Sequence, residues 1–189
     1  MTAFETSLQK HLAIFADQEM YFVHDTRNLE LFASIPLNIS EEDIRTKLSA
    51  INDTEINRHA MMGDVIAHIL KLQIDDRLKK GDLSVVEDIA HITSNGKAHH
   101  LLHFASVYGN FHRPDIFPIY SDQYLDFYKR YIREYKLPLD PDKLNTYDVF
   151  SKALDDLVNR LALKGKMNYL QLRKFAWLYA ETVVKEGKN

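Results

Sequence analysis

Glycine and proline are scarce in this chain, and their placement is its strongest constraint on folding. The 189 residues include six glycines and five prolines. These cluster at a few positions and leave long uninterrupted stretches, which favours helices over many short strands. There is no internal repeat and no low-complexity segment. Seven or eight helices with short connections predict an all-α fold, built as a single domain over residues 1–189.

Apolar periodicity and capping residues place the expected helices. Apolar residues from Phe4 to Phe15 recur at helical spacing and predict the first helix. Ser40 with Asp43 resembles a capping box and predicts a helix that ends near Ile51. Asn52 or Asp53 is expected to cap the next helix, and Asn168 the last one. The complete set of expected helices covers about residues 2–19, 41–51, 54–79, 84–92, 97–108, 122–136, 146–163 and 168–184.

Two segments leave alternatives open. The stretch EMYFVHDT, which begins residues 19–39, fits either a short strand or an extended connection. A pair of strands over residues 19–39 would change the class to α+β. The run KLPLDPDKLN is the clearest linker in the chain. This linker leaves open a subdomain boundary near residues 137–145, as the alternative to an unbroken domain.

Composition excludes several classes of function. There is no cysteine, which rules out disulfides, thiolate catalysis and cysteine metal sites and fits a reducing compartment. The formal net charge of −3 gives no general attraction to nucleic acid or to anionic membranes, so either would need a local basic patch. No signal peptide is recognised, and no window approaches the roughly 20 apolar residues of a membrane span. A soluble, cytoplasmic protein without membrane association is expected.

Histidines are the first candidate for chemistry. His99 and His103 are four residues apart on an expected helix, so their rings share one face, and His100 points elsewhere. Two imidazoles at this spacing are half of a zinc site, which would serve a metal-dependent hydrolase. Neither a glutamate between them nor a nearby acid completes the site, so no metal and no other cofactor is expected. His112, in the following loop, is expected to be structural.

The helix expected at 122–136 carries an aromatic stripe that continues from Tyr120, with basic residues interleaved. Stacking rings beside cations suit a nucleic-acid surface. Tyrosines at helical spacing equally suit the boundary of a core, with the ring inside and the hydroxyl in water. The residues concerned are Tyr120, Tyr124, Phe127, Tyr128, Tyr131, Tyr135, Lys129, Arg130, Arg133 and Lys136.

A helical hairpin is the third candidate. Ser84 and Glu87 resemble a capping box that opens the helix at 84–92. The turn Asn95-Gly96-Lys97 would then lead into the next helix. Backbone N–H groups at the start of a helix carry partial positive charge and can hold a phosphate, to which Lys97 would add a full charge. A plain antiparallel helix pair is the alternative.

The NGK turn and the stretch LLHFASVYGNFHRPDIFPIYSD resemble the helix-hairpin-helix DNA glycosylase superfamily. They are also similar to uncharacterised bacterial helical proteins with FASKY, FHNP and FPIYD-like segments, as is the C-terminal LQLRKFAWLYA. The resemblance covers about residues 84–136 and the last helix. It implies a helical domain built around a helix-hairpin-helix unit, with DNA as the partner.

The resemblance also implies roles for individual residues. Lys97 corresponds to the lysine that attacks the sugar C1′, and Asp122 to the acid that stabilises the developing charge. The sequence departs from the family pattern in three ways. The turn has one glycine, Asp122 is displaced by Tyr120 and Ser121, and Val107 replaces a lysine of the bacterial segments. A catalytically degenerate, binding member is therefore expected at least as much as a glycosylase or lyase. Its expected DNA-binding residues are Asn95, Gly96, Lys97, Arg113, Arg130 and Arg133.

A different class of function competes with this one. The acidic net charge favours a helical protein-interaction or regulatory module, without chemistry and with an unknown partner.

Overall fold

The computed structural model describes residues 3–18, 24–58 and 60–186. Within them the chain forms eleven α-helices and one two-stranded sheet. The prediction of a mainly helical protein is confirmed, but the helices outnumber the seven or eight expected, and the sheet is new. The elements are α1 (Ala3–Gln18), α2 (His24–Ser34), α3 (Glu41–Ile51), α4 (Thr54–Arg58), α5 (Met62–Leu72), α6 (Asp75–Lys80), α7 (Ser84–Ala90), β1 (His91–Ser94), β2 (Lys97–His100), α8 (Leu102–His112), η2 (Asp122–Tyr124), α9 (Leu125–Tyr135), η3 (Pro141–Lys143), α10 (Tyr147–Arg160) and α11 (Tyr169–Glu186).

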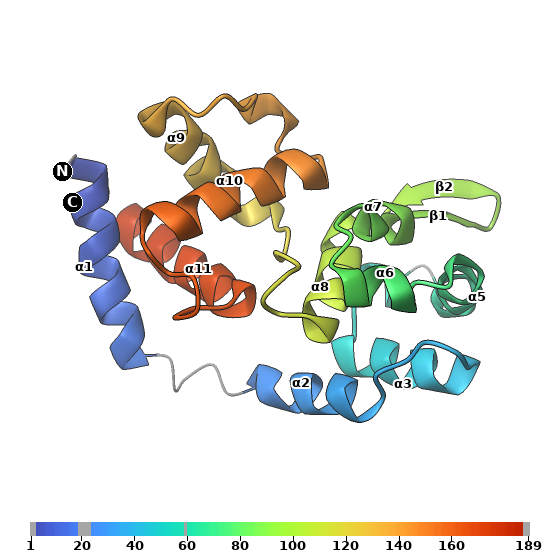
Figure 1. The fold of residues 1–189 in the computed structure, drawn as a ribbon. Helices are drawn as coiled ribbons and strands as arrows, with labels where there is room; N and C mark the ends of the chain where they lie inside the picture. Colours follow the sequence, from blue (N-terminus) through green and yellow to red (C-terminus); the bar gives the residue numbers. More distant parts are fainter. Residues whose placement is uncertain (1–2, 19–23, 59, 187–189) are drawn as a thin grey trace.

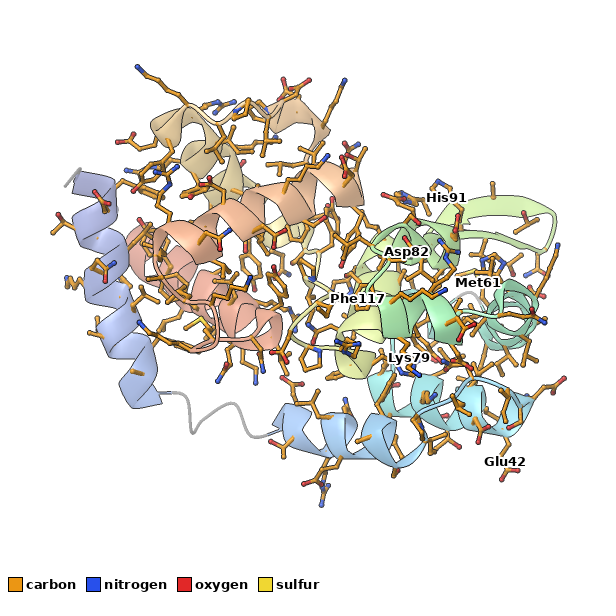
Figure 2. All side chains as sticks on the ribbon, viewed as in Figure 1. Glu42, Met61, Lys79, Asp82, His91 and Phe117 are labelled. Carbon is orange, nitrogen blue, oxygen red and sulfur yellow. The ribbon has the colours of Figure 1, made fainter. Side chains whose placement is uncertain are left out.

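The elements gather in two groups (Figure 1). Helices α1, α9, α10 and α11 form the terminal group, in which α1 packs against α11. Helices α2 to α8 and the β1–β2 hairpin form the central group. The segment 113–121 joins them, and the fully buried Phe117 lies where they meet (Figure 2). Buried apolar side chains make one cluster that includes residues of both groups, such as Phe4 and Ile69.

Local capping signals predicted two helices well. The Ser40 hydroxyl accepts the backbone N–H of Asp43 at 3.1 Å and begins α3, which ends at Ile51 as expected. At the other end of the chain, the Asn168 side chain accepts the N–H of Gln171, and the Gln171 side chain accepts the N–H of Asn168, both at 2.9 Å. This reciprocal pair satisfies two N–H groups at the start of α11.

The prediction of one long helix at 54–79 is wrong. The chain forms α4, α5 and α6 there, with breaks at Ala60 and Gln73. Both residues have positive φ, 51° and 49°, which ends the preceding helical turn. Apolar periodicity continues across these breaks, so it cannot reveal them.

The prediction of a helical hairpin around Asn95-Gly96-Lys97 is also wrong. Residues 91–94 and 97–100 form antiparallel strands, with His91 opposite His100 and Ser94 opposite Lys97. Between them, Asn95 and Gly96 have φ of 51° and 72°, as a two-residue type I′ β-turn requires. Helix α8 therefore begins at Leu102 rather than near Lys97.

The expected capping box at the start of α7 does not form either. The N–H of Ser84 is accepted by the carboxylate of Asp82 at 3.0 Å, and the N-cap residue, Leu83, makes no side-chain capping bond. The Glu87 carboxylate instead accepts the backbone N–H of Tyr147.

The structure describes most of the first segment with open alternatives and all of the second. Residues 24–34 form helix α2, so they are not a strand, whereas residues 19–23 lie outside the described part. The linker at 137–145 contains the short turn η3, with Asp140 accepting the N–H of Asp142 at 3.0 Å. None of the described helices combines the length and the apolar character needed to cross a bilayer.

A buried polar network ties the loop before α3 to α6 and α8. Lys47 Nζ donates to the Asn38 side-chain oxygen at 2.8 Å, and the Tyr108 hydroxyl donates to the same oxygen at 2.5 Å. Asn38 in turn donates to Asp75 at 2.6 Å and lies 3.3 Å from His112 Nε2. Burial lowers the pKa of Lys47 to about 8, although Asp75 acts to raise it. Because these polar groups satisfy one another, the network can be buried without a large penalty.

Candidate functional site

An open cleft of about 740 Å³ is lined by several side chains that can act as acids, bases or metal ligands. Residues of the central group form one wall, and the segment around η2 and the start of α10 form the other. We call it the acid–histidine cleft, because four acidic residues and three histidines line it. The lining residues are Asp53, Thr54, Glu55, Glu87, His91, His100, Leu101, Leu102, His103, Phe104, Tyr120, Asp122, Asn145 and Thr146.

Two histidines and a glutamate meet at one end of the acid–histidine cleft. His91 and His100 are cross-strand partners, so their side chains lie on the same face of the hairpin, with ring centroids 4.4 Å apart. Glu87 precedes His91 by four residues on α7. One Glu87 oxygen, Oε2, lies 2.9 Å from His100 Nε2 and 3.6 Å from His91 Nδ1.

This cluster is held from outside. The second Glu87 oxygen, Oε1, accepts the backbone N–H of Tyr147 at 2.7 Å, at the start of α10. His91 Nδ1 lies 2.8 Å from the Glu87 backbone carbonyl, to which it donates. The Glu87 carboxylate is therefore fixed by the terminal group and presented to both histidines.

An acid–histidine pair forms a second cluster. His103 Nδ1 lies 3.8 Å from Asp53 Oδ2, with the Asp53 side chain 10% exposed and that of His103 47% exposed. The other Asp53 oxygen accepts the N–H groups of Glu55 and Ile56, at 2.9 and 3.1 Å. Burial is the largest influence on the Asp53 pKa and raises it, but these N–H groups and His103 together bring it below its ordinary value.

A tyrosine–aspartate pair completes the cleft. The Tyr120 hydroxyl donates to Asp122 at 2.5 Å. Burial, and after it the hydrogen bond to Asp122, raises the pKa of Tyr120 well above its ordinary value. Tyr120 therefore stays protonated, while Asp122 is exposed and faces the solvent of the cleft.

Comparison with known proteins places the chain in a family. A family model named HI_0787_N, described as an N-terminal domain, matches residues 7–116, more than half of the sequence. The chain belongs to the HI_0787_N family. An uncharacterised protein of Haemophilus influenzae strain KW20 Rd is 30% identical over 132 residues, which are 66% of this chain and 60% of that protein. The chain thus spans about three fifths of this relative's length. No solved structure matches the chain.

The HI_0787_N match divides the cleft unequally. Asp53, Glu87, His91, His100 and His103 all lie within residues 7–116. The opposite wall, from Tyr120 to Thr146, lies beyond the matched segment. The family segment therefore carries both acid–histidine clusters.

The two residues expected to be catalytic are not brought into one site. Asp122 lines the cleft, but Lys97 is not among the lining residues. Lys97 begins β2 at the tip of the hairpin, opposite Ser94, and is exposed together with Asn95 and Gly96. The turn thus offers exposed backbone, but at the junction of two strands rather than at the start of a helix.

The arginines expected to bind DNA are dispersed. Arg113 donates to the backbone carbonyl of Lys79 at 2.9 Å, at the end of α8. Arg130, on α9, lies over the ring of Phe4 with 4.9 Å to the centroid, and Arg133 lies on the same helix. Helix α9 and the hairpin belong to different groups and lie far apart in the view of Figure 1. These cations do not extend the turn into one continuous track.

The aromatic stripe of α9 belongs to the core. Tyr124, Phe127, Tyr128 and Tyr131 are each at most 7% exposed. The rings lie inside, as the core-boundary interpretation expects, but the Tyr131 hydroxyl donates to Asp156 and is not in water. Rings buried in this way cannot stack on nucleobases.

The histidines are arranged differently from the sequence prediction. His99 lies on β2 and His103 on α8, so they do not share a helix face. His100, expected to point elsewhere, faces His91 and Glu87 instead. His112 is structural, as expected, with its ring 4.9 Å from that of Phe32.

Sequence reasoning missed Glu87, His91 and Asp53. The signal that could have found the first two is the run HITSNGKAHH. Asn-Gly between two short alternating segments is a strong indicator of a β-hairpin, and a two-residue turn there pairs His91 with His100. Asp53 was recognised only as a helix cap.

Proposed function

We propose that the acid–histidine cleft is the active site of a hydrolase, in which His103 removes a proton from water. The observation that carries the proposal is the Asp53–His103 pair in an open cleft. The Asp53 carboxylate, fixed by two backbone N–H groups, has a lowered pKa and stays ionised. It favours the tautomer of His103 with the proton on Nδ1, which leaves Nε2 free to act as a base.

The reaction follows from that arrangement. His103 Nε2 takes a proton from water as the water oxygen forms a bond to the carbonyl carbon of an ester or amide. The protonated ring then gives this proton to the leaving oxygen or nitrogen, as its bond to carbon breaks. The products are a carboxylic acid and an alcohol or amine, and His103 returns to its starting state.

The charge of the cleft indicates the substrate class. Four acidic residues line it, and none of the described lining residues is Lys or Arg. Such a cleft attracts cations and repels phosphates, whereas its charge does not oppose the entry of neutral molecules. Asp122, exposed at the opposite wall, is suited to bind an ammonium group of the substrate. We therefore propose esters or amides with neutral or positively charged substituents.

Hydrolysis of chromogenic esters and amides tests this proposal. We expect aminoacyl esters with a free ammonium group to be cleaved faster than their succinylated, anionic counterparts. His103→Gln should lower the rate roughly 100- to 10,000-fold, with an unchanged melting temperature because His103 is exposed. Lys97→Ala is the matched control and should keep the wild-type rate, since Lys97 does not line the cleft. An unaltered rate in His103→Gln, or no hydrolysis by the wild type, would refute the proposal.

Association with nucleic acid is the second candidate, favoured by the exposure of the hairpin turn. Asn95, Gly96 and Lys97 are exposed, and nothing lies within 4 Å of a Cβ built on Gly96. A phosphate could approach these backbone groups, with Lys97 beside it. Lys97→Ala should then weaken DNA binding and reduce its salt dependence by about one charge. Salt-independent or undetectable binding to duplex and single-stranded DNA would exclude this function.

A further inference from the structure

We infer that Glu87, His91 and His100 bind a divalent transition metal, with zinc as the best fit. One ligand atom from each residue lies within 4.8 Å of the other two. Zinc bonds to imidazole nitrogen and carboxylate oxygen are about 2.0–2.2 Å long, so neighbouring ligand atoms of a tetrahedral site are about 3.3–3.6 Å apart. The observed separation between Glu87 Oε2 and His100 Nε2, 2.9 Å, lies close to that range.

The types of ligand favour a transition metal over calcium or magnesium. Two imidazoles and one carboxylate suit zinc, iron, nickel or copper, whereas calcium and magnesium prefer oxygen ligands alone. Three protein ligands also leave a coordination position open, which is the pattern of catalytic rather than structural zinc. The side chains are 29% (Glu87), 65% (His91) and 40% (His100) exposed, so this position is accessible from the cleft.

The surroundings orient the ligands before any cation binds. Glu87 Oε1 is held by the N–H of Tyr147, which leaves Oε2 toward the histidines. The Nδ1–H group of His91 is donated to the Glu87 carbonyl, which leaves the lone pair on Nε2. Metal-binding histidines commonly donate their second ring N–H to a carbonyl in this way. The pairing of β1 with β2 fixes the two rings on one face.

The cation would also act on the charge of the cleft. The acid–histidine cleft has four acidic lining residues and no basic one among those described, and a divalent cation offsets two of these charges. A metal held by Glu87, His91 and His100 would lower the pKa of a water bound at the open position, and His103 lines the same cleft and would serve as the base. This catalytic role rests on the proposed hydrolase function, whereas the binding of the metal does not.

Calorimetric titration of ZnCl₂ into the tag-free, EDTA-dialysed full chain tests the site directly. We expect one zinc per chain, with proton release that differs between buffers of different ionisation enthalpy, because the ligands must lose protons. Substitution of Co²⁺ should give the visible absorption of a tetrahedral complex. Stoichiometry well below one zinc per chain for the wild type would overturn the inference.

Variants of neighbouring histidines provide the matched control. His100→Gln and His91→Gln should each weaken zinc binding at least tenfold. His99→Gln should not, because adjacent residues of a strand point to opposite faces. Equal weakening by His99→Gln and His100→Gln would overturn the inference.

The metal site and the hydrolase function can fail separately. His103→Gln should retain zinc and lose hydrolysis. Zinc binding by a protein that hydrolyses nothing would support the metal site and refute the hydrolase. Hydrolysis by the wild type without zinc binding would support the hydrolase and refute the metal site.

Discussion

His112 should make the protein lose stability in mild acid. Its ring packs edge-on against Phe32 and lies beside Tyr108, with centroid distances of 4.9 and 5.3 Å. Its Nε2 accepts the amide N–H of Asn38 at 3.3 Å. Burial, and after it the charge of Lys47, lowers the pKa of His112 from 6.5 to about 3. The folded protein therefore holds a neutral imidazole at pH values where the unfolded chain is protonated.

The sign and size of the effect follow from proton linkage. As pH falls below 6.5, the unfolded state binds a proton at His112 that the folded state does not bind until about pH 3. The unfolded state is favoured progressively across this interval. With these two pKa values, the free energy of unfolding should fall by about 2 kcal/mol between pH 7 and pH 5. For a chain of this size, that corresponds to roughly 4–8 °C in melting temperature.

Urea unfolding followed by circular dichroism at several pH values between 7 and 5 measures this slope. His112→Asn should be less stable at pH 7, because it loses the aromatic packing, but its stability should change much less with pH. His91→Gln is the control for loss of a histidine outside the core, since the His91 side chain is 65% exposed. Equal slopes in wild type and His112→Asn, or an NMR titration of His112 near its ordinary pKa, would refute the reasoning.

Three further substitutions test buried contacts, each by urea unfolding. Gly109→Ala places a Cβ 3.2 Å from the buried ring of Phe117 and should cost about 1–3 kcal/mol, less any gain in helix propensity. Ser106→Ala leaves the buried N–H of Tyr120 without its acceptor at 2.9 Å and should cost about 1–3 kcal/mol. The pKa of Lys47 is lowered from 10.5 to about 8, so between pH 7 and pH 9 the folded state loses a proton that the unfolded state keeps. The wild type should therefore be about 1 kcal/mol more stable at pH 9 than at pH 7, and Lys47→Met should lack this increase.

Features set by neighbouring residues could be predicted from the sequence. Ser40 begins α3 and Asn168 begins α11, because a capping side chain acts on N–H groups two or three residues away. The same kind of local signal gave a wrong prediction at Ser84. Its N–H group was expected to bond to the Glu87 side chain, but it bonds to the nearby Asp82 side chain. A cap can thus be recognised from composition, but the choice between two adjacent candidates depends on the path of the incoming chain.

The site depends on contacts between distant residues, which periodicity does not encode. His91 meets His100 only because the chain pairs as strands, and Asp53 meets His103 across 50 positions of the sequence. A helix after Lys97 would place His99 beside His103 and point His100 elsewhere. In the strand that forms instead, His100 pairs with His91. The error of predicting a helix where β2 forms therefore predicted the pair His99–His103 in place of the pair His91–His100.

Glu87 links the candidate metal site to the packing of the two groups. One of its oxygens caps α10 through the N–H of Tyr147, and the other faces His100. Tyr147 also donates its hydroxyl to the carbonyl of Pro118, at 2.8 Å, in the segment that joins the groups. A cation bound to Glu87 would therefore favour the state in which α10 is docked on α7. Because a ligand that binds only the folded state stabilises it in proportion to the logarithm of its concentration, zinc should raise the melting temperature of the wild type. Glu87→Gln, which keeps an oxygen for Tyr147 but loses the charge, should fold without that response.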